Sequence, residues 1–191
     1  MKKHFYSIFA LFLVGTMFSC QSPKSNSAKE AVAGIDSMAP NPFITHMYTA
    51  DPSAHVWADG RLYVYASHDI DPPRGCDLMD RYHVFSTDDM VNWTDHGEIL
   101  NSSQVPWGRK EGGFMWAPDC AYKDGTYYFY FPHPSDTKWN NSWKIGVATS
   151  KEPAANFTVQ GYIEGMDPLI DPCVFVDDDG QAYICLLYTS P

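Results

Sequence analysis

From residue 41 onward, apolar residues either alternate with polar ones or form short runs that stop at Gly, Pro, Asp or Asn. This pattern predicts short β-strands, and no window after the N-terminal apolar segment carries a convincing helical period. Three segments repeat one arrangement, in which an apolar run, an Asp-Gly turn and a second apolar run follow each other. The three segments are 51–65, 116–130 and 169–183. Asp-Gly between apolar runs is typical of a β-hairpin, so the sequence predicts three hairpins of similar design.

The three hairpins share one register. Counting back nine positions from the glycine of each turn reaches Asp51, Trp116 and Asp171. Because equivalent positions of a repeated unit occupy equivalent places in the fold, we expect these three side chains to converge on one site.

Further strands follow the first two hairpins. Segments 81–87 and 94–100 predict a third and a fourth strand, and 143–150 and 157–159 repeat them. Four-stranded units that recur every ~55–65 residues are typical of a β-propeller, whereas a β-sandwich would not return one register position each time. We therefore predict an all-β propeller.

The propeller predicted for residues 41–191 is incomplete. About 150 residues suffice for roughly two and a half blades, fewer than the four that the smallest closed ring needs. We expect the chain to be a fragment of a longer protein, the alternative being a ring completed by another chain. Residues 185–191 continue the blade pattern poorly and are expected to be a truncation or read-through artefact.

The N-terminus has the pattern of an export signal. A basic start, Met1–His4, precedes an apolar stretch at 5–18 that is too short to span a bilayer. Cys20 follows a small residue there, which is typical of a bacterial lipoprotein whose mature chain begins at the lipidated Cys20. The alternative is an ordinary secretory signal cut nearby. Residues 21–40 predict a flexible tether, so we expect a protein of the cell envelope that meets the membrane only through its lipid.

Composition narrows the choice of partner. The net charge of −10 argues against a nucleic-acid partner, since no basic stripe is present that could displace counterions from phosphate. Aromatic residues make up 15% of the chain and charged ones 19%, which suits a large β core and a ligand such as a sugar, whose C–H faces stack on aromatic rings.

Two of the register residues have the chemistry for glycoside hydrolysis. Inversion needs two carboxyl groups on opposite sides of the sugar, roughly 6.5–9.5 Å apart. Asp51 and Asp171, at the starts of separate blades and each followed by a proline, meet the requirement of position. The alternative is that both are strand-end caps that bind their own backbone.

The motifs around these residues resemble those of family 43 glycoside hydrolases. The resemblance covers about residues 41–184. The matching segments, in family order, are Thr49–Ser53, Asp88–Trp93, Phe114–Asp119 and Ile170–Gly180. It implies a five-bladed propeller and inverting hydrolysis of arabinose- or xylose-containing polysaccharides, of the α-L-arabinofuranosidase or β-xylosidase type.

The resemblance also implies roles for individual residues. Asp51 would be the general base, Asp171 the carboxylate that orients the general acid and tunes its pKa, and Trp116 a wall on which sugar stacks. The general acid of the family is a Glu on a later blade, which this chain does not reach, so we expect the chain by itself to be inactive. The family's central metal, often calcium, has no ligand that can be assigned here.

Two histidines are further candidates for contact with the sugar. His68 lies in the first long insertion, 67–80, and His133 closes the second hairpin, where it could equally be an ordinary loop histidine. A non-catalytic carbohydrate-binding propeller is the competing function. A fructan hydrolase is disfavoured, because Ala50 stands where that class has Asn.

Overall fold

The computed structural model describes residues 41–70, 75–135 and 141–188. The predicted lipoprotein signal, Cys20 and the tether at 21–40 lie outside these residues, as do the last three residues, 189–191. The strands of the described segments are β1 Tyr48–Val56, β2 Leu62–Asp69, β3 Arg81–Thr87, β4 Trp93–Asn101, β5 Asp119–Lys123, β6 Thr126–Pro134, β7 Trp143–Ser150, β8 Thr158–Tyr162, β9 Leu169–Val176 and β10 Ala182–Tyr188. A short helix, α2 Gly75–Leu78, and a 3₁₀ turn, η1 Ser102–Gln104, accompany them.

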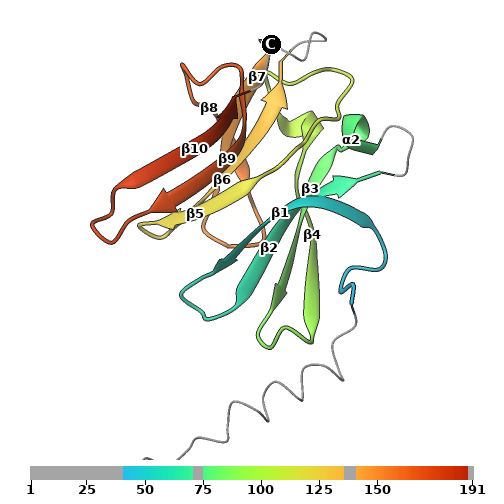
Figure 1. Cartoon of the computed structure of the whole chain (residues 1–191), viewed down its shortest axis with the longest axis vertical. Helices are drawn as coiled ribbons and strands as arrows, with labels where there is room; N and C mark the ends of the chain where they lie inside the picture. Colours follow the sequence, from blue (N-terminus) through green and yellow to red (C-terminus); the bar gives the residue numbers. More distant parts are fainter. Residues whose placement is uncertain (1–40, 71–74, 136–140, 189–191) are drawn as a thin grey trace, which may run out of the picture.

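The strands form three antiparallel sheets that follow the chain: β1-β2-β3-β4, β5-β6-β7-β8 and β9-β10. In Figure 1 the sheets lie side by side in chain order, with β1 next to β5 and β5 next to β9. Two four-stranded blades and one hairpin of a third confirm the predicted partial propeller, and the predicted bounds 81–87 and 143–150 match β3 and β7. No helix within the described segments is long and apolar enough to cross a bilayer.

The hairpins form where the Asp-Gly turns predicted them. In the second hairpin Asp124 and Gly125 both have positive φ, 50° and 74°, as a two-residue type I′ turn requires. The first and third hairpins share a longer turn, in which the glycine amide bonds back three residues, Gly60 to Trp57 and Gly180 to Asp177. The first and third hairpins are therefore alike in their turns, and the second differs.

The main core lies between the first two blades. Its rings include Tyr65, Tyr82, Phe129 and Phe131, all with no exposed surface, and Tyr82 packs edge-on against Phe129 at 5.0 Å between centroids. Burial of an aromatic side chain of this size stabilises the fold by about 2–3 kcal/mol. The hydroxyls of Tyr65 and Tyr82 each donate a hydrogen bond, to the carbonyls of Pro153 and Trp116, so neither buried phenol is left unpaired.

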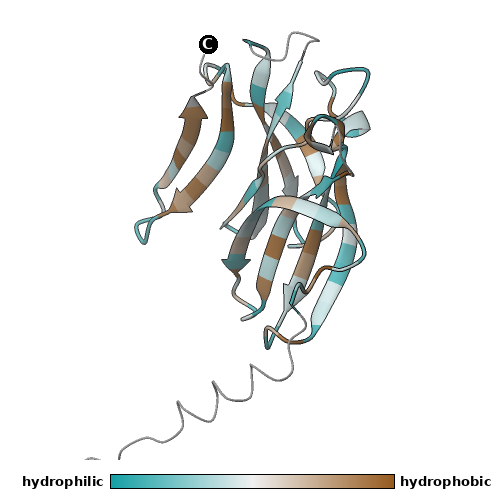
Figure 2. Ribbon diagram, turned by 45° about the vertical axis from the view of Figure 1, so that its right-hand side comes forward, coloured by the Kyte–Doolittle hydropathy of each residue, from teal (hydrophilic) through white to brown (hydrophobic). Residues whose placement is uncertain are grey.

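A smaller cluster covers the opposite face of the first sheet. Val64, Ala66 and Phe85 are buried there beneath the segment that precedes β1, and Phe43 from that segment stacks on Trp93 at 3.8 Å. Figure 2 shows hydrophobic positions on the strands and hydrophilic ones at the turn of the β9–β10 hairpin. The first sheet is thus covered on both faces, on one by the second blade and on the other by its own N-terminal segment.

Candidate active site

Asp51 and Asp171 occupy the same local structure in β1 and β9. At each, two residues of the strand, the aspartate and its proline, stand opposite a single residue of the partner strand, which is a β-bulge. Proline has no amide hydrogen to donate to the ladder, and it is tolerated at a bulge because a bulged residue is not paired there. Asp51 has φ 50° and Asp171 has φ 52°, a left-handed conformation that costs about 1–2 kcal/mol in a residue with a side chain. Such shared strain is characteristic of functional sites.

The two aspartates line one groove of about 460 Å³. Its walls come from the starts of β1 and β9 and from the segment that leads into β5. The lining residues are Asp51, Pro52, Ser53, Ala54, His55, Ala117, Pro118, Asp119, Asp171, Pro172, Cys173 and Val174. The structure therefore brings the two predicted carboxylates together, as the shared register implied.

Burial and the charge of Asp51 both affect the proton affinity of Asp171. Burial and then the nearby charge of Asp51 raise the pKa of Asp171 above its usual value. Asp171 is half-buried whereas Asp51 is exposed, so the pair combines two different environments. Beneath them, burial and then the charges of Asp51 and Asp171 raise the pKa of the fully buried Tyr82, which stays protonated. Different environments for paired carboxyls are how enzymes separate the roles of two chemically similar groups.

Trp116 is not among the residues that line this groove, but it directly precedes two that do, and it is held by the first long insertion and by β3. Its indole Nε1 donates to the Cys76 carbonyl at 2.6 Å, and its own carbonyl accepts from the Tyr82 hydroxyl at 2.8 Å. The ring lies 4.7 Å from that of Trp143 and is partly exposed. Ala117 and Pro118, which follow it, line the groove. A sugar-stacking role for Trp116 stays a prediction, with a partly exposed indole in a suitable place.

Asp119 is a site residue that sequence analysis missed. Its carboxylate is 4% exposed and accepts hydrogen bonds from Ser53 Oγ at 2.5 Å and from the Val174 amide at 2.5 Å, while His55 Nε2 lies 2.7 Å away. Burial works to raise the pKa of Asp119, but these hydrogen bonds outweigh it and hold the pKa below its usual value. The available signal was an aspartate placed in a recognised motif immediately before an apolar run.

His133 does not line the groove. Its side chain has no exposed surface, and a Cβ at Gly108 would approach its Nε2 to 2.7 Å. Burial lowers the pKa of His133 to about 4, so the ring is neutral. The predicted contact between His133 and the sugar stays a prediction, and in this structure the loop that contains Gly108 lies against the buried ring.

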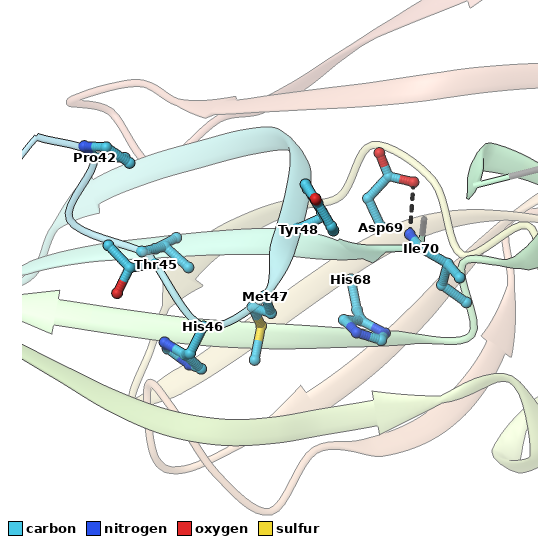
Figure 3. A pocket seen from close by; sticks show the side chains of 9 residues that line it. Pro42, Thr45, His46, Met47, Tyr48, His68, Asp69 and Ile70 are labelled. Atoms are coloured by element: carbon cyan, nitrogen blue, oxygen red, sulfur yellow. Dashed lines mark hydrogen bonds between the residues drawn. The ribbon is translucent and has the colours of Figure 1, made fainter. Parts of the chain in front are cut away.

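His68 lies at a different cavity from the two aspartates. This cavity, of about 780 Å³, is lined by residues 42, 44–48 and 68–70, and Figure 3 shows His46, Met47 and His68 around it. His68 Nδ1 is 3.2 Å from Asp80 Oδ1, and its ring is 5.9 Å from that of His83. Its cross-strand partner is Thr49, whereas the neighbouring pair Ala50–Ser67 faces the second blade. The structure thus does not bring His68 to the groove of Asp51.

Comparison with protein families matches residues 39–189 to "Glycosyl hydrolases family 43". The chain belongs to this family. Among curated relatives, the xylosidase/arabinosidase 43A of Humicola insolens is 45% identical over 153 residues, and a xylosidase/arabinosidase of Bacteroides ovatus is 39% identical over 145. These alignments cover 75% and 72% of this chain but only 44% and 42% of the relatives. The family 43 chain described here therefore spans less than half the length of the relatives it matches.

Solved structures of the family have the same blades. CoXyl43, a GH43 β-xylosidase/α-arabinofuranosidase from a compost metagenome solved with xylotriose in a calcium-free form, is 46% identical, with a TM-score of 0.65 over 74% of this chain and 43% of its own. The GH43_1 enzyme of Xanthomonas citri, solved with xylotriose, is 39% identical, with a TM-score of 0.65 over 81% and 44%. These family 43 neighbours are five-bladed propellers, and this chain corresponds to part of that fold.

Within the described residues of this family 43 chain, no cluster of three or more His, Cys, Asp or Glu side chains could hold a metal ion. Three carboxylates line the groove, those of Asp51, Asp119 and Asp171. The carboxylate oxygens of Asp119 already accept hydrogen bonds from protein donors, the Ser53 hydroxyl and the Val174 amide. The described residues therefore give no set of ligands that can be assigned to the central calcium that the resemblance implies.

Proposed function

We propose that this chain is the N-terminal part of an inverting glycosidase that acts on arabinose- or xylose-containing polysaccharides or oligosaccharides, of the α-L-arabinofuranosidase or β-xylosidase type. The observation that carries the proposal is the pair Asp51 and Asp171, held in one groove by identical bulges on two blades. The relatives named xylosidase/arabinosidase and the neighbours solved with xylotriose support a pentose-containing substrate.

In this proposal Asp51 acts as the general base. Its exposed carboxylate takes a proton from a water molecule, which attacks the anomeric carbon while a general acid on the other side protonates the leaving oxygen. Asp171 adds a second, half-buried carboxyl whose pKa is raised by burial and by Asp51, and it orients the acid and adjusts its proton affinity. Trp116 offers its partly exposed ring for stacking against the sugar.

The general acid is not among the residues that form this groove. In the described segments no glutamate lines it, so we propose that the chain by itself binds sugar without turning it over. The same observation favours the second candidate, a carbohydrate-binding propeller with no catalytic acid.

One experiment separates the two candidates. The gene extended in frame from its source DNA is expressed and assayed with p-nitrophenyl α-L-arabinofuranoside and β-D-xyloside, and NMR follows the anomer released first. We expect hydrolysis with inversion and a loss of at least ~10³-fold in kcat for Asp51→Asn, with Asp124→Asn on the exposed second turn as the matched control. An extended protein that binds xylotriose yet hydrolyses neither substrate refutes the enzyme and supports the binding propeller.

We also propose export to the cell envelope as a lipoprotein, from the signal-like sequence that ends at Cys20. Metabolic labelling with radioactive palmitate in a bacterial host should mark the wild-type chain and not the Cys20→Ser variant. Unlabelled wild-type protein cut near residue 20 would point instead to an ordinary secretory signal.

A further inference from the structure

The buried carboxylate of Asp119 joins three blades. It opens β5, takes the Ser53 hydroxyl and the His55 ring from β1 on Oδ1, and takes the Val174 amide from β9 on Oδ2. The Cys120 amide adds a fourth contact, to Oδ1 at 2.8 Å. Hydrogen bonds to an ionised acceptor are about twice as strong as neutral ones. The contacts of Asp119, called the Asp119 node below, therefore hold the three inner strands together firmly.

The anchored atoms lie close in sequence to the two groove carboxylates. Ser53 comes two residues after Asp51, and Val174 comes three residues after Asp171. Both anchors lie just beyond the bulge that carries the aspartate, where regular strand pairing resumes. The node therefore links the two bulges through one side chain from a third blade.

The bulges need such support. Asp51 and Asp171 are held at positive φ, and the proline after each has no amide with which to bind a neighbouring strand. A strained backbone persists only where its surroundings over-determine it. Ladder pairing holds each bulge to its own hairpin, but it does nothing to fix one hairpin relative to another. The contacts of Asp119 cross between hairpins, and so they can set that distance.

We propose that Asp119 is the positioning residue that fixes the spacing of Asp51 and Asp171 across the three blades. The inference rests on the proposed function only in treating these two as base and orienting carboxylate. A displacement of about 1 Å in a reacting group can cost on the order of 10²-fold in rate, so a device that fixes the spacing acts directly on catalysis.

The side chains around Asp119 do not form a second catalytic centre. Ser53, His55 and Asp119 are the residue types of a hydrolytic triad, but the serine and the carboxylate both meet the same imidazole nitrogen, Nε2. In a triad the two partners bind opposite ring nitrogens, which lets the ring pass a proton to the hydroxyl. Ser53 also donates directly to the carboxylate, so its hydroxyl serves as an anchor rather than as a nucleophile.

The test measures the coupling between the two groove carboxylates in the full chain, without sugar. Titration of ¹³C-labelled aspartates by NMR follows the pKa of Asp171 with and without the Asp51→Asn change, and the difference is the coupling. In the Asp119→Asn variant, the new side-chain NH2 group would face a hydrogen-bond donor where the carboxylate oxygen accepted one, so the contact would be lost. We expect the coupling between Asp51 and Asp171 to fall by roughly half or more. The milder Ser53→Ala keeps the charge of Asp119 but removes one anchor, and it should reduce the coupling less.

The control is Asp124→Asn, an identical change at the exposed turn of the same β5–β6 hairpin, which should leave the coupling unchanged. Circular dichroism shows which variants fold, and if Asp119→Asn does not, Ser53→Ala decides. The proposal is overturned if the coupling is unchanged in a folded Asp119→Asn chain or, where that variant does not fold, in Ser53→Ala. It is also overturned if Asp124→Asn loses as much coupling as Asp119→Asn. The titration involves no hydrolysis, so it can support the positioning role of Asp119 even if the extended protein proves inactive. Failure of the positioning proposal and failure of the proposed glycosidase function therefore give different results.

Discussion

The buried histidine His133 makes the stability of the fold depend on pH. Its pKa falls from 6.5 in the unfolded chain to about 4 in the fold, because burial penalises the charged ring. Between these values the unfolded chain binds more protons than the folded one. Stability is therefore complete above about pH 7.5 and is lost as the pH falls through 6.5 toward 4.

The size of the effect follows from the two values. A shift of one pKa unit corresponds to about 1.36 kcal/mol, so the full loss is about 3 kcal/mol, reached once the pH lies below both values. At pH 5 the unfolded histidine is nearly fully protonated and the folded one is nearly all neutral, which gives a loss of about 2 kcal/mol. That is a large share of the 5–15 kcal/mol typical of a domain.

The assay is urea unfolding followed by tryptophan fluorescence, at pH 8 and pH 5, for the wild type and for His133→Phe and His133→Gln. Other groups also titrate in this range, but the difference between wild type and variant isolates His133. The wild type should lose about 2 kcal/mol more than either variant between the two pH values. Equal losses would show that the ring accepts a proton inside the fold and would refute the account of its burial.

Three further predictions concern packing and charge. Phe129→Ala, in the core between the blades, should destabilise by about 3–5 kcal/mol in urea unfolding, because Phe129 has no exposed surface. Tyr82→Phe should cost about 1 kcal/mol in the same assay, because the part-buried hydrogen bond from the Tyr82 hydroxyl to the Trp116 carbonyl is lost. Asp51→Asn should lower the pKa of Asp171, because a neighbouring negative charge is removed while burial is kept, and ¹³C NMR titration measures the shift.

The two stability predictions have matched controls. Phe175→Ala removes a phenylalanine that is 61% exposed, and Tyr183→Phe removes a hydroxyl from a tyrosine that is 55% exposed, so both should change stability by less than about 0.5 kcal/mol. Equal effects at core and control sites would contradict the packing account. An unchanged pKa of Asp171 in Asp51→Asn would mean that the two carboxylates do not interact across the groove.

Sequence analysis predicted the strands well because the signals that form them are local. An Asp-Gly pair between apolar runs specifies a turn whatever the rest of the chain does, and all three hairpins form where those pairs stand. Alternation likewise placed β3 and β7 within their observed bounds. The repeat in register was enough to bring Asp51 and Asp171 to one groove.

The place of His68 could not be predicted from the sequence, because 67–80 reads as one insertion whereas β2 continues to Asp69 and includes His68. Which face of the blade meets its neighbour then depends on how the blades pack. His68 falls on the face that the N-terminal segment covers.

By itself, then, the sequence determined the hairpins, the blade repeat and the register that unites the two aspartates, because each of these follows from neighbours along the chain. Only the tertiary structure decided the burial of His133 and the contacts of Asp119. The partners of Asp119 on β1 and β9 lie 55 to 66 positions away along the chain, and no local pattern records a contact that forms only when three blades pack together. Contacts of that range come from packing, since the chain must fold before they exist.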